Sequence, residues 1–406
     1  MVHSSHEPFR VFCICGAFGF PFGTASTKRI RLIGKCFVSC GIPFHVWHIG
    51  PPPFKENKHK TGEHEGITFE YLSPSMHRPR ILMQRTLFYL WGCLLLFVAL
   101  FRNRHNGLVY VYYQGDFINL WILFLCKIMN IPIVQEACEW WPGTANATAL
   151  NAWMYKNIMF KWSDGAIVIS HAIQNRINAL VGSAYPVCMV PVLVDPAENT
   201  ALTTREAKDV SASPVLLWCG MADGYARDVY FLIDAMARLQ STAGNNSLLR
   251  IVGPCTKKFR DKLLSYANSK NIPAARLDIV GFVSDAQLWN YCTKADALLM
   301  PMWDDDRSIT RFPTKLGQYL ASGRPIITAR VGEVKHFLSD ETAMFYLPGD
   351  ANSLAHSLDS VLSDPPLGEK LATRATEVVL PRVDYRSNAQ QICKWFCQIF
   401  SKIRQR

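Results

Sequence analysis

The sequence predicts an α/β protein made of two doubly wound halves, each built on a sheet of parallel strands. Three observations support this prediction. The chain has 406 residues, which exceeds one ordinary domain and suits two. Short apolar runs alternate along it with amphipathic segments, the pattern of repeated strand–helix–strand units. A polar stretch of small residues near the middle separates the two halves.

The composition excludes a disordered chain and leaves several partners open. Hydrophobic residues make up 49% and charged residues 18% of the chain, enough to build two buried cores. The net charge of +11 suits an anionic membrane surface, a phosphorylated substrate, nucleic acid, or simply a basic enzyme. We expect no nucleic-acid partner, because the chain has no dense Lys/Arg block and no zinc-finger spacing.

The cysteines and the N-terminus indicate a cytoplasmic protein. The 13 cysteines are scattered through apolar runs and never form a pair of C-x-x-C units. This is the use of cysteine as a small buried hydrophobe in a reducing compartment, so no metal site is expected. The first ten residues, MVHSSHEPFR, lack the basic-then-apolar design of a secretory signal.

The first half opens as a strand–helix–strand unit. A strand over 9–15 leads into a Gly-rich loop, then a helix over 28–41 that Gly41 ends, and a second strand over 42–50. Sheets of this kind bind ligands at the carboxyl ends of their strands. The Pro- and charge-rich residues 51–66 are expected to form a loop.

A long apolar run follows. Residues 86–101 carry no charge, and arginines flank both ends. A membrane span needs about 20 apolar residues and a basic bias on one side, so we expect a buried or a membrane-surface helix instead. The surface alternative implies peripheral attachment at the cytoplasmic face of a membrane, and whether the run contacts lipid stays open.

The remaining elements complete two halves. The other strands expected in the first half are continuous apolar runs, as buried parallel strands require: 108–113, 131–138, 165–170 and 187–192. The strands expected in the second half are 214–220, 248–254, 277–282, 297–302 and 324–329. The expected domains are therefore 1–195 and 214–384, with a linker at 196–213 and an amphipathic terminal helix over 385–406.

The segment 311–329, RFPTKLGQYLASGRPIITA, predicts an anion site on a loop–helix–strand unit. Pro313 suits the first turn of a helix. The unpaired N–H groups and the dipole at that turn favour an anion such as a diphosphate, and Lys315 adds positive charge. Gly323 ends the helix. A loop–helix–strand unit without a ligand is the alternative that the pattern leaves open.

This segment resembles the nucleotide-sugar signature P-x-K-x-x-E-Y-x-A-x-G-x-P of the family-4 glycosyltransferases. Three further stretches resemble the same family, in the same order. FGFPFGTASTKRIR resembles its Gly-rich entry loop, EACEWWP its E-x-x-D-x-W-P stretch, and WCGMADGYARD its loop with Gly-Arg and a later Lys. The resemblance spans almost the whole chain. It implies the GT-B fold, with two facing Rossmann-like domains and the last helix crossing back onto the first.

The resemblance also implies an activity. The family transfers a sugar, with retention of configuration and without a metal or other cofactor, from a nucleotide diphosphate held by the C-terminal domain. The expected donor is a UDP- or GDP-linked sugar. The expected acceptor is a polysaccharide, a glycolipid or another lipid-linked glycan.

Carried over position by position, the resemblance assigns the site residues. Glu139 stands where the family has an Asp or, in other branches, a His, and is assigned to the catalytic site, as a contact to the acceptor or the sugar or as a base for the acceptor hydroxyl. Glu136 is assigned a structural role. The expected donor-binding residues are Gly23, Thr24, Arg227, Phe312, Thr314, Lys315 and Gln318.

The sequence departs from the family at three positions. Thr310 and Gln318 replace the two glutamates of the E-x7-E pattern, and Met221 replaces an arginine. An acidic run at 304–306 offers a substitute carboxylate or forms a solvated loop. These departures support an alternative function, a GT-B-like protein that binds a sugar nucleotide or a partner subunit without catalysis.

Overall fold

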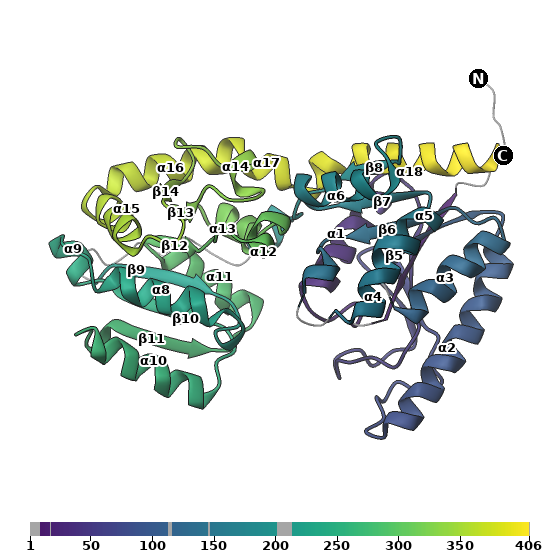
Figure 1. Ribbon diagram of the computed structural model, residues 1–406, viewed down its shortest axis with the longest axis horizontal. Helices are drawn as coiled ribbons and strands as arrows, with labels where there is room; N and C mark the ends of the chain where they lie inside the picture. The colour runs from purple at the N-terminus through teal and green to yellow at the C-terminus, as the bar shows by residue number, and fades with distance from the viewer. Residues whose placement is uncertain (1–8, 17, 113–115, 145–146, 201–212, 406) are drawn as a thin grey trace. The chain divides into compact units, whose positions relative to one another are not determined.

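The computed structural model divides the chain into two compact units (Figure 1). Unit 1 comprises Met1–Leu193 together with Tyr385–Arg406, and unit 2 comprises Val194–Asp384. The residues that the structure describes are 9–16, 18–112, 116–144, 147–200 and 213–405.

The expected linker, 196–213, is described only in part. Its residues 201–212 lie outside the described residues. Its first residues form a short helix, α7 (Pro196–Thr200), and the backbone N–H of Ala197 donates to Asp195 Oδ1 at 3.1 Å. The domain limits expected from the sequence stay a prediction.

Unit 1 is built on an eight-stranded sheet in the order β3-β4-β2-β1-β5-β6-β7-β8, with all neighbours parallel except β3 and β4. Its strands are β1 (Arg10–Cys15), β2 (Phe44–His48), β3 (Thr61–His64), β4 (Ile67–Tyr71), β5 (Gly107–Tyr112), β6 (Ile133–Ala137), β7 (Gly165–Val168) and β8 (Val187–Met189). Its helices are α1 (Ala25–Ser39), α2 (Leu82–Asn103), α3 (Phe117–Ile128), the 3₁₀ turn η1 (Trp141–Gly143), α4 (Ala149–Met154), the π-helical η2 (Tyr155–Met159), α5 (Phe160–Trp162), α6 (His171–Val181) and α18 (Tyr385–Arg404).

Helices pack on both faces of this sheet. On one face α18 runs along α1, and the ring of Phe396 meets that of Phe37 edge-on at 4.8 Å. Val134 of β6 belongs to the core cluster on this face. The next side chain, Gln135, points to the other face, where it exchanges hydrogen bonds of 3.2 and 3.3 Å with Asn119 of α3. The central strands are therefore buried on both sides, as their continuous apolar runs predict.

The prediction of a loop over 51–66 was wrong for β3. Glu65 and Gly66 both have positive φ, 50° and 78°, as a two-residue hairpin turn of type I′ requires. They join β3 to β4 as an antiparallel hairpin at the edge of the sheet. The sequence concealed this strand because its side chains are mostly exposed and polar.

Helix α2 is longer and more exposed than expected. It has 22 residues, its most apolar window has a mean hydropathy of 1.6, and only 17% of that window is buried. By length and composition alone it is sufficient to cross a membrane. The helix is therefore long enough to span a membrane, unlike the 16 apolar residues on which the expectation rested, and the expectation of a buried helix was wrong.

Unit 2 is built on a six-stranded sheet in the order β11-β10-β9-β12-β13-β14, with all neighbours parallel. Its strands are β9 (Val215–Cys219), β10 (Leu248–Val252), β11 (Leu277–Gly281), β12 (Ala297–Met300), β13 (Ile326–Ala329) and β14 (Met344–Tyr346). Besides α7, its helices are η3 (Asp223–Tyr225), α8 (Ala226–Met236), α9 (Thr242–Asn245), α10 (Lys257–Ser269), η4 (Ala274–Arg276), α11 (Asp285–Lys294), α12 (Asp306–Thr310), α13 (Lys315–Ser322), α14 (Val334–Phe337), α15 (Ala351–Ser363), α16 (Pro365–Val378) and α17 (Leu380–Val383). The predicted α/β class with two parallel sheets is confirmed.

A buried ion pair fixes the first helix of unit 1 on its sheet. Arg29 of α1 lies 3.0 Å, Nε to Oε1, from Glu136 of β6, and both side chains are buried. The guanidinium also donates to the carbonyl oxygens of Pro191 and Val190 at 2.8 and 3.2 Å. Tyr110 donates its hydroxyl to the other oxygen of Glu136. Each polar atom of this pair therefore finds a partner inside the unit.

Replacing Arg29 by Met should destabilise unit 1 by about 3–5 kcal/mol, because Glu136 would be left as an uncompensated buried charge. Urea unfolding followed by circular dichroism measures the loss. Burial raises the pKa of Glu136, and Arg29 opposes this rise. Without Arg29 the pKa rises further, so the loss in free energy of unfolding relative to wild type should shrink as the pH falls and the carboxyl becomes protonated.

The matched control is Arg31→Met on the same helix. Arg31 pairs with the partly exposed Glu65 at 2.7 Å, and such a pair contributes about 1 kcal/mol or less. Equal losses for the two variants would show that the buried pair has no special part in the stability of unit 1.

Candidate functional site

The strand order of unit 2 reverses between β9 and β12. In parallel α/β sheets, ligands bind outside the carboxyl ends of the strands at such a point. β9 ends at Cys219 and β12 at Met300. The loops that begin at Gly220 and at Pro301 therefore border the expected ligand position of this unit.

Lys315, the first residue of α13, reaches this position. Its Nζ lies 4.1 Å from the centroid of the ring of Trp218, a buried residue of β9. Gly220, the next residue after β9, has φ of 155°, and a Cβ there would lie 2.9 Å from the Trp218 ring and 3.3 Å from the Lys315 ammonium. Glycine at this position therefore lets the ammonium lie over the ring.

Arg227, at the start of α8, is held at the same edge by two contacts. Its Cζ lies 3.6 Å from the centroid of the Trp303 ring, and its NH1 lies 3.2 Å from Asp305 Oδ2. Trp303 in turn donates from Nε1 to the buried Asp228 at 2.7 Å. The Arg227 side chain is 63% exposed, so these contacts orient the guanidinium while N–H groups remain for a ligand.

Two further arginines lie beside the ring of Tyr225, in the turn before α8. The Cζ atoms of Arg307 and Arg311 are 4.6 and 5.5 Å from its centroid. Nε of Arg311 is buried and has no hydrogen-bond partner among the described residues. In the described part of the chain, no ion pair involves Arg307, Arg311 or Lys315. We call Arg227, Arg307, Arg311 and Lys315 the cation group.

The buried Asp228 balances only part of this positive charge. Burial raises the pKa of Asp228, although the Trp303 hydrogen bond and the charges of Lys315, Arg311 and Arg307 oppose the rise. Burial lowers the pKa of Lys315; Asp228 opposes this shift and the charge of Arg311 adds to it. An anion bound at this position would therefore favour the charged form of Lys315.

The other predicted donor residues of unit 2 differ in exposure. Thr314 is exposed at the start of α13 and makes no side-chain capping hydrogen bond. Gln318 is half-buried one turn further along. Phe312 is buried, with its ring edge-on to that of Phe337 at 4.8 Å. Its side chain therefore packs in the interior of unit 2. If Phe312 contacts the donor, it does so through its backbone, just before α13.

Gly23 and Thr24 lie in unit 1, at the exposed start of α1 and after the loop that follows β1. This loop is tied to the rest of the unit at Phe22, whose backbone N–H and C=O form bonds of 3.0 and 2.8 Å with the Asn57 side chain. The Thr24 side chain does not cap α1. The first N–H groups of α1 thus lie at an exposed, anchored turn that suits an anion.

Glu139 is exposed, two residues beyond the end of β6. The hydroxyl of Tyr155 donates to its carbonyl oxygen at 3.1 Å, which fixes the backbone there. Glu136, three residues earlier, is committed to the buried pair with Arg29. The structure thus gives Glu136 the structural place that the sequence predicted for it.

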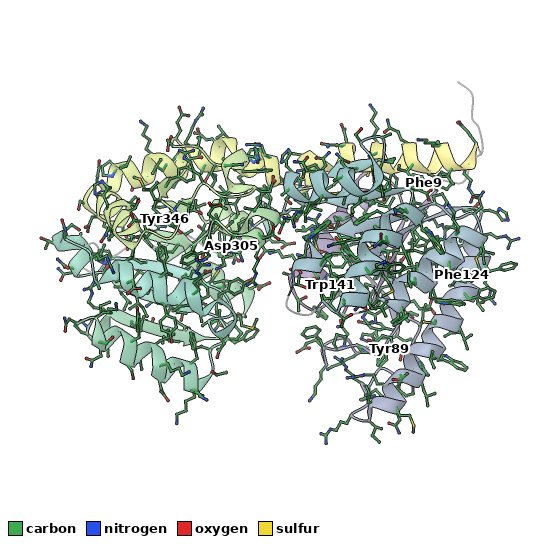
Figure 2. All side chains as sticks on the ribbon, in the orientation of Figure 1. Phe9, Tyr89, Phe124, Trp141, Asp305 and Tyr346 are labelled. Atoms are coloured by element: carbon green, nitrogen blue, oxygen red, sulfur yellow. The ribbon has the colours of Figure 1, made fainter. Side chains whose placement is uncertain are left out.

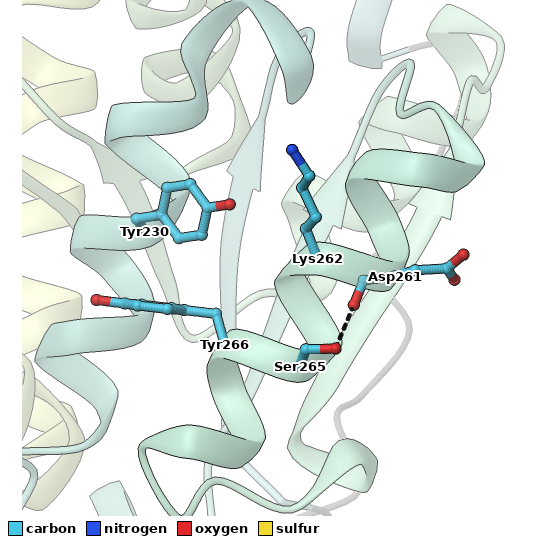
Figure 3. A pocket seen from close by; sticks show the side chains of 5 residues that line it. All are labelled: Tyr230, Asp261, Lys262, Ser265 and Tyr266. Atoms are coloured by element: carbon cyan, nitrogen blue, oxygen red, sulfur yellow. Dashed lines mark hydrogen bonds between the residues drawn. The ribbon is translucent and has the colours of Figure 1, made fainter.

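A separate hollow lies on the outside of unit 2, between α8 and α10 (Figure 3). The rings of Tyr230 and Tyr266 meet there at 4.7 Å, and Lys262 supplies one ammonium. The Ser265 hydroxyl donates to the carbonyl oxygen of Asp261 at 3.0 Å. None of the cation group lines this hollow, so it is a weaker candidate for an anionic ligand.

The chain was compared with known proteins. Residues 213–364 match the family model described as "Glycosyl transferases group 1". Glycogen synthase of Mycobacterium tuberculosis is 22% identical over 242 residues, 59% of this chain and 54% of that protein. The chain thus spans about half the length of the curated relatives it matches.

Two solved structures resemble the whole chain. Sucrose-phosphate synthase from Thermosynechococcus elongatus has a TM-score of 0.73 and 18% identity, covering 97% of this chain and 100% of its own. HepE of Anabaena, solved in complex with UDP, has a TM-score of 0.70 and 15% identity, covering 96% and 100%. The chain has the GT-B fold, and the match to the group 1 glycosyltransferase model covers residues 213–364. The cation group lies entirely within the residues that match this family model.

The sequence predicted two members of the cation group, Arg227 and Lys315. It did not predict the side chains that position them through ring contacts and hydrogen bonds. Asp228 ends the stretch WCGMADGYARD but was given no role, and Trp303 belongs to no motif; their contact joins α8 to the loop after β12. Arg311 was quoted only as the first residue of the segment 311–329, without a role of its own. Their positions carried a signal, because Asp228, Trp303 and Arg311 lie in segments that follow β9 or β12, the strands on either side of the reversal in strand order.

The lowered pKa of Lys315 predicts how anion binding depends on pH. The ratio of the wild-type affinity for pyrophosphate to that of Lys315→Arg, in which the ligand's own ionisation cancels, should fall as the pH rises through the pKa of Lys315, where the ammonium loses its charge. Calorimetric titrations between neutral and alkaline pH measure this loss. The midpoint should lie below the ordinary value for lysine.

Two variants test the assignment. Lys315→Arg should bind pyrophosphate at neutral pH and show no alkaline loss, because a guanidinium stays protonated. Lys315→Met should bind weakly at every pH. An alkaline loss that persists in Lys315→Arg would assign the titration to another group.

Proposed function

We propose that this protein is a glycosyltransferase of the family-4 type, which moves a sugar from a nucleotide diphosphate to an acceptor hydroxyl with retention of configuration. The observation that carries the proposal is the cation group at the reversal of strand order in unit 2. Its cations lie against aromatic rings and beside one buried carboxyl, so positive charge remains for a ligand.

The chemistry of the donor explains the need for this charge. When the bond between sugar C1 and the diphosphate oxygen breaks, negative charge grows on the leaving nucleoside diphosphate. Cations fixed in advance around that position stabilise the charge at little reorganisation cost. Lys315 supplies a point charge at the start of α13, and Arg227 supplies a planar guanidinium that matches two phosphate oxygens.

The nucleotide is proposed to carry uracil or guanine. HepE of Anabaena, a structural relative, was solved with UDP and with UDP-glucose, which makes UDP-sugars the first choice for a test. In unit 1, Glu139 is the proposed base or contact for the acceptor hydroxyl, whose proton must leave as the new bond to C1 forms. The proposed acceptor is a polysaccharide, a glycolipid or another lipid-linked glycan.

Two observations favour a second function, binding without catalysis. Thr310, which stands in place of the first glutamate of the E-x7-E pattern, is buried and donates its hydroxyl to the carbonyl oxygen of Asp306 at 2.8 Å. It cannot supply the missing carboxylate. Met221, in place of the arginine, is 53% exposed and offers no charge. Turnover measurements separate this function from the first.

The first experiment is a thermal-unfolding panel of UDP, GDP, ADP, CMP and their common sugar conjugates. A ligand at about 100 times its dissociation constant should add roughly 2.7 kcal/mol to the free energy of unfolding. A shift with one nucleotide names the donor class. Stabilisation by no nucleotide would contradict sugar transfer and sugar-nucleotide binding, and would leave binding of a partner subunit as the function to test.

The second experiment measures release of nucleoside diphosphate from the donor that binds, with and without glycan acceptors. The variant Arg227→Ala/Lys315→Ala should lower turnover at least about 100-fold, since it removes two groups that stabilise the leaving diphosphate. The matched control, Arg238→Ala/Lys370→Ala, removes two exposed cations of unit 2 outside the cation group and should leave turnover unchanged.

The outcomes separate the two functions. Turnover lost in the first variant and kept in the control supports transfer at the cation group. Full turnover in Arg227→Ala/Lys315→Ala would refute the site. Tight binding of a sugar nucleotide by the wild type, with no turnover on any acceptor and no donor hydrolysis, would support the binding function.

A further inference from the structure

The outward face of α2 is apolar along its whole length. Its exposed side chains recur in steps of one, three and four residues and therefore lie on one face of the helix. Between 39% and 70% of each is exposed. They are Met83, Leu87, Leu90, Trp91, Leu94, Phe97, Val98 and Phe101.

This pattern is the reverse of an ordinary surface helix, whose outer face is polar. The inner face of α2 is already used by unit 1. Gly92, Leu96 and Leu100 are buried. A Cβ at Gly92 would lie 2.0 Å from the carbonyl oxygen of Ile49, so the helix backbone lies directly against the end of β2. α2 therefore contributes one face to the core and exposes a second apolar face to solvent.

Helix α3 extends the same surface. Figure 1 shows α2 and α3 together along one side of unit 1, and Trp121 of α3 donates to the carbonyl oxygen of Cys93 of α2 at 3.4 Å. Phe117, Phe124 and Ile128 are exposed on α3, and Figure 2 shows Phe124 at the outer edge of the unit. We call the exposed apolar side chains of the two helices the α2–α3 surface. Monomeric soluble proteins rarely leave so many large apolar side chains together without a partner.

The charges around this surface indicate the partner. Residues 71–115 contain no Asp or Glu, and Asp116, the first acidic residue after them, is the N-cap of α3 and accepts a hydrogen bond from the backbone N–H of Asn119. Arg78, Arg80 and Arg85 lie at the start of α2, and Arg102 and Arg104 at its end. Among the ion pairs of the described residues, none involves these five arginines. The surface is thus apolar in the middle and cationic at both ends.

An anionic lipid bilayer complements both features. Acyl chains cover apolar side chains, and lipid phosphates pair with arginines at the same depth. A second copy of the chain fits less well, because facing copies of the surface would bring arginines near both ends of one α2 against those of the other. We propose that the α2–α3 surface docks unit 1 on an anionic membrane, with α2 lying in the plane of the bilayer.

The packing of α2 decides between lying on the membrane and crossing it. At about 1.5 Å per residue its 22 residues span about 33 Å, which would suffice for crossing. Crossing would require the buried side chains of α2 to leave the sheet and the contact at Gly92 to break. Lying in the plane keeps these contacts and covers only the exposed face.

Co-sedimentation of the full chain with vesicles tests the proposal without any sugar donor, so its outcome is separate from that of the proposed function. Wild type should bind vesicles of phosphatidylcholine with phosphatidylglycerol, bind pure phosphatidylcholine much less, and be released by high salt. Leu87→Glu/Leu94→Glu should lower the partition coefficient at least about tenfold. Phe282→Glu, at an exposed apolar residue of unit 2, is the matched control and should bind like wild type.

A second pair of variants tests the charge. Arg78→Gln/Arg80→Gln/Arg85→Gln should lower the partition coefficient about a hundredfold, since each basic residue near an anionic surface contributes about fivefold. Lys257→Gln/Lys258→Gln/Lys262→Gln removes as many exposed charges from unit 2 and should change binding little. These positions are exposed except for Arg85, which is half-buried, and thermal unfolding of each variant checks that the substitutions leave folding undisturbed.

Three results would overturn the proposal. The first is absence of wild-type binding to either vesicle. The second is equal loss in the surface variants and their controls, which would assign binding to net charge alone. The third is a wild type that binds no lipid but self-associates in ultracentrifugation, with the self-association abolished in Leu87→Glu/Leu94→Glu. Retention of the protein in vesicles after an alkaline carbonate wash would refute the in-plane arrangement.

Discussion

Parallel pairing of β9 with β12 is the constraint on which the candidate site of unit 2 depends. The two strands lie side by side, with Leu216 opposite Ala297 and Leu217 opposite Leu298, so both chains leave the sheet at the same edge. The segments that follow then lead to α8 and α13, whose first residues reach that edge. Arg227 and Lys315 belong to segments far apart in the sequence, and the strand order alone brings them to one place.

Four cations at one edge of the sheet repel one another unless neighbouring groups offset the repulsion. The kind of neighbour, carboxylate or aromatic ring, determines whether positive charge remains for a ligand. A carboxylate for each cation would neutralise the group and leave nothing for an anion. Aromatic faces attract a cation without cancelling its charge, and Trp218, Trp303 and Tyr225 have this role. Asp228 lies behind Trp303, where its carboxyl fixes the indole through Nε1. The group thus keeps a positive field in the absence of a ligand, at the price of a lowered pKa for Lys315.

The sequence predicted those features that a local pattern encodes. Buried parallel strands are continuous apolar runs, and the helix before Gly323 was confirmed to end there with the glycine in the left-handed conformation. Strand β3 was missed because an exposed edge strand has no apolar pattern of its own, although Glu65 and Gly66 at its turn carried a signal. Trp303 was missed for a different reason. Its partner lies on another element, and the contact between them cannot be inferred before the order of the strands is known.

The placement of helix α2 also could not be predicted from its sequence alone. Its sequence is apolar on all faces, so composition identifies it as a core helix, a surface helix or a membrane span without choosing among them. The choice depends on which face meets the sheet, and Gly92 decides that by allowing the backbone to approach Ile49. Once this face is fixed, Leu87, Trp91 and Leu94 must point outward. The close packing that completes the core of unit 1 is therefore also what exposes an apolar surface, and the free energy of exposing it to water is regained only when a partner covers it.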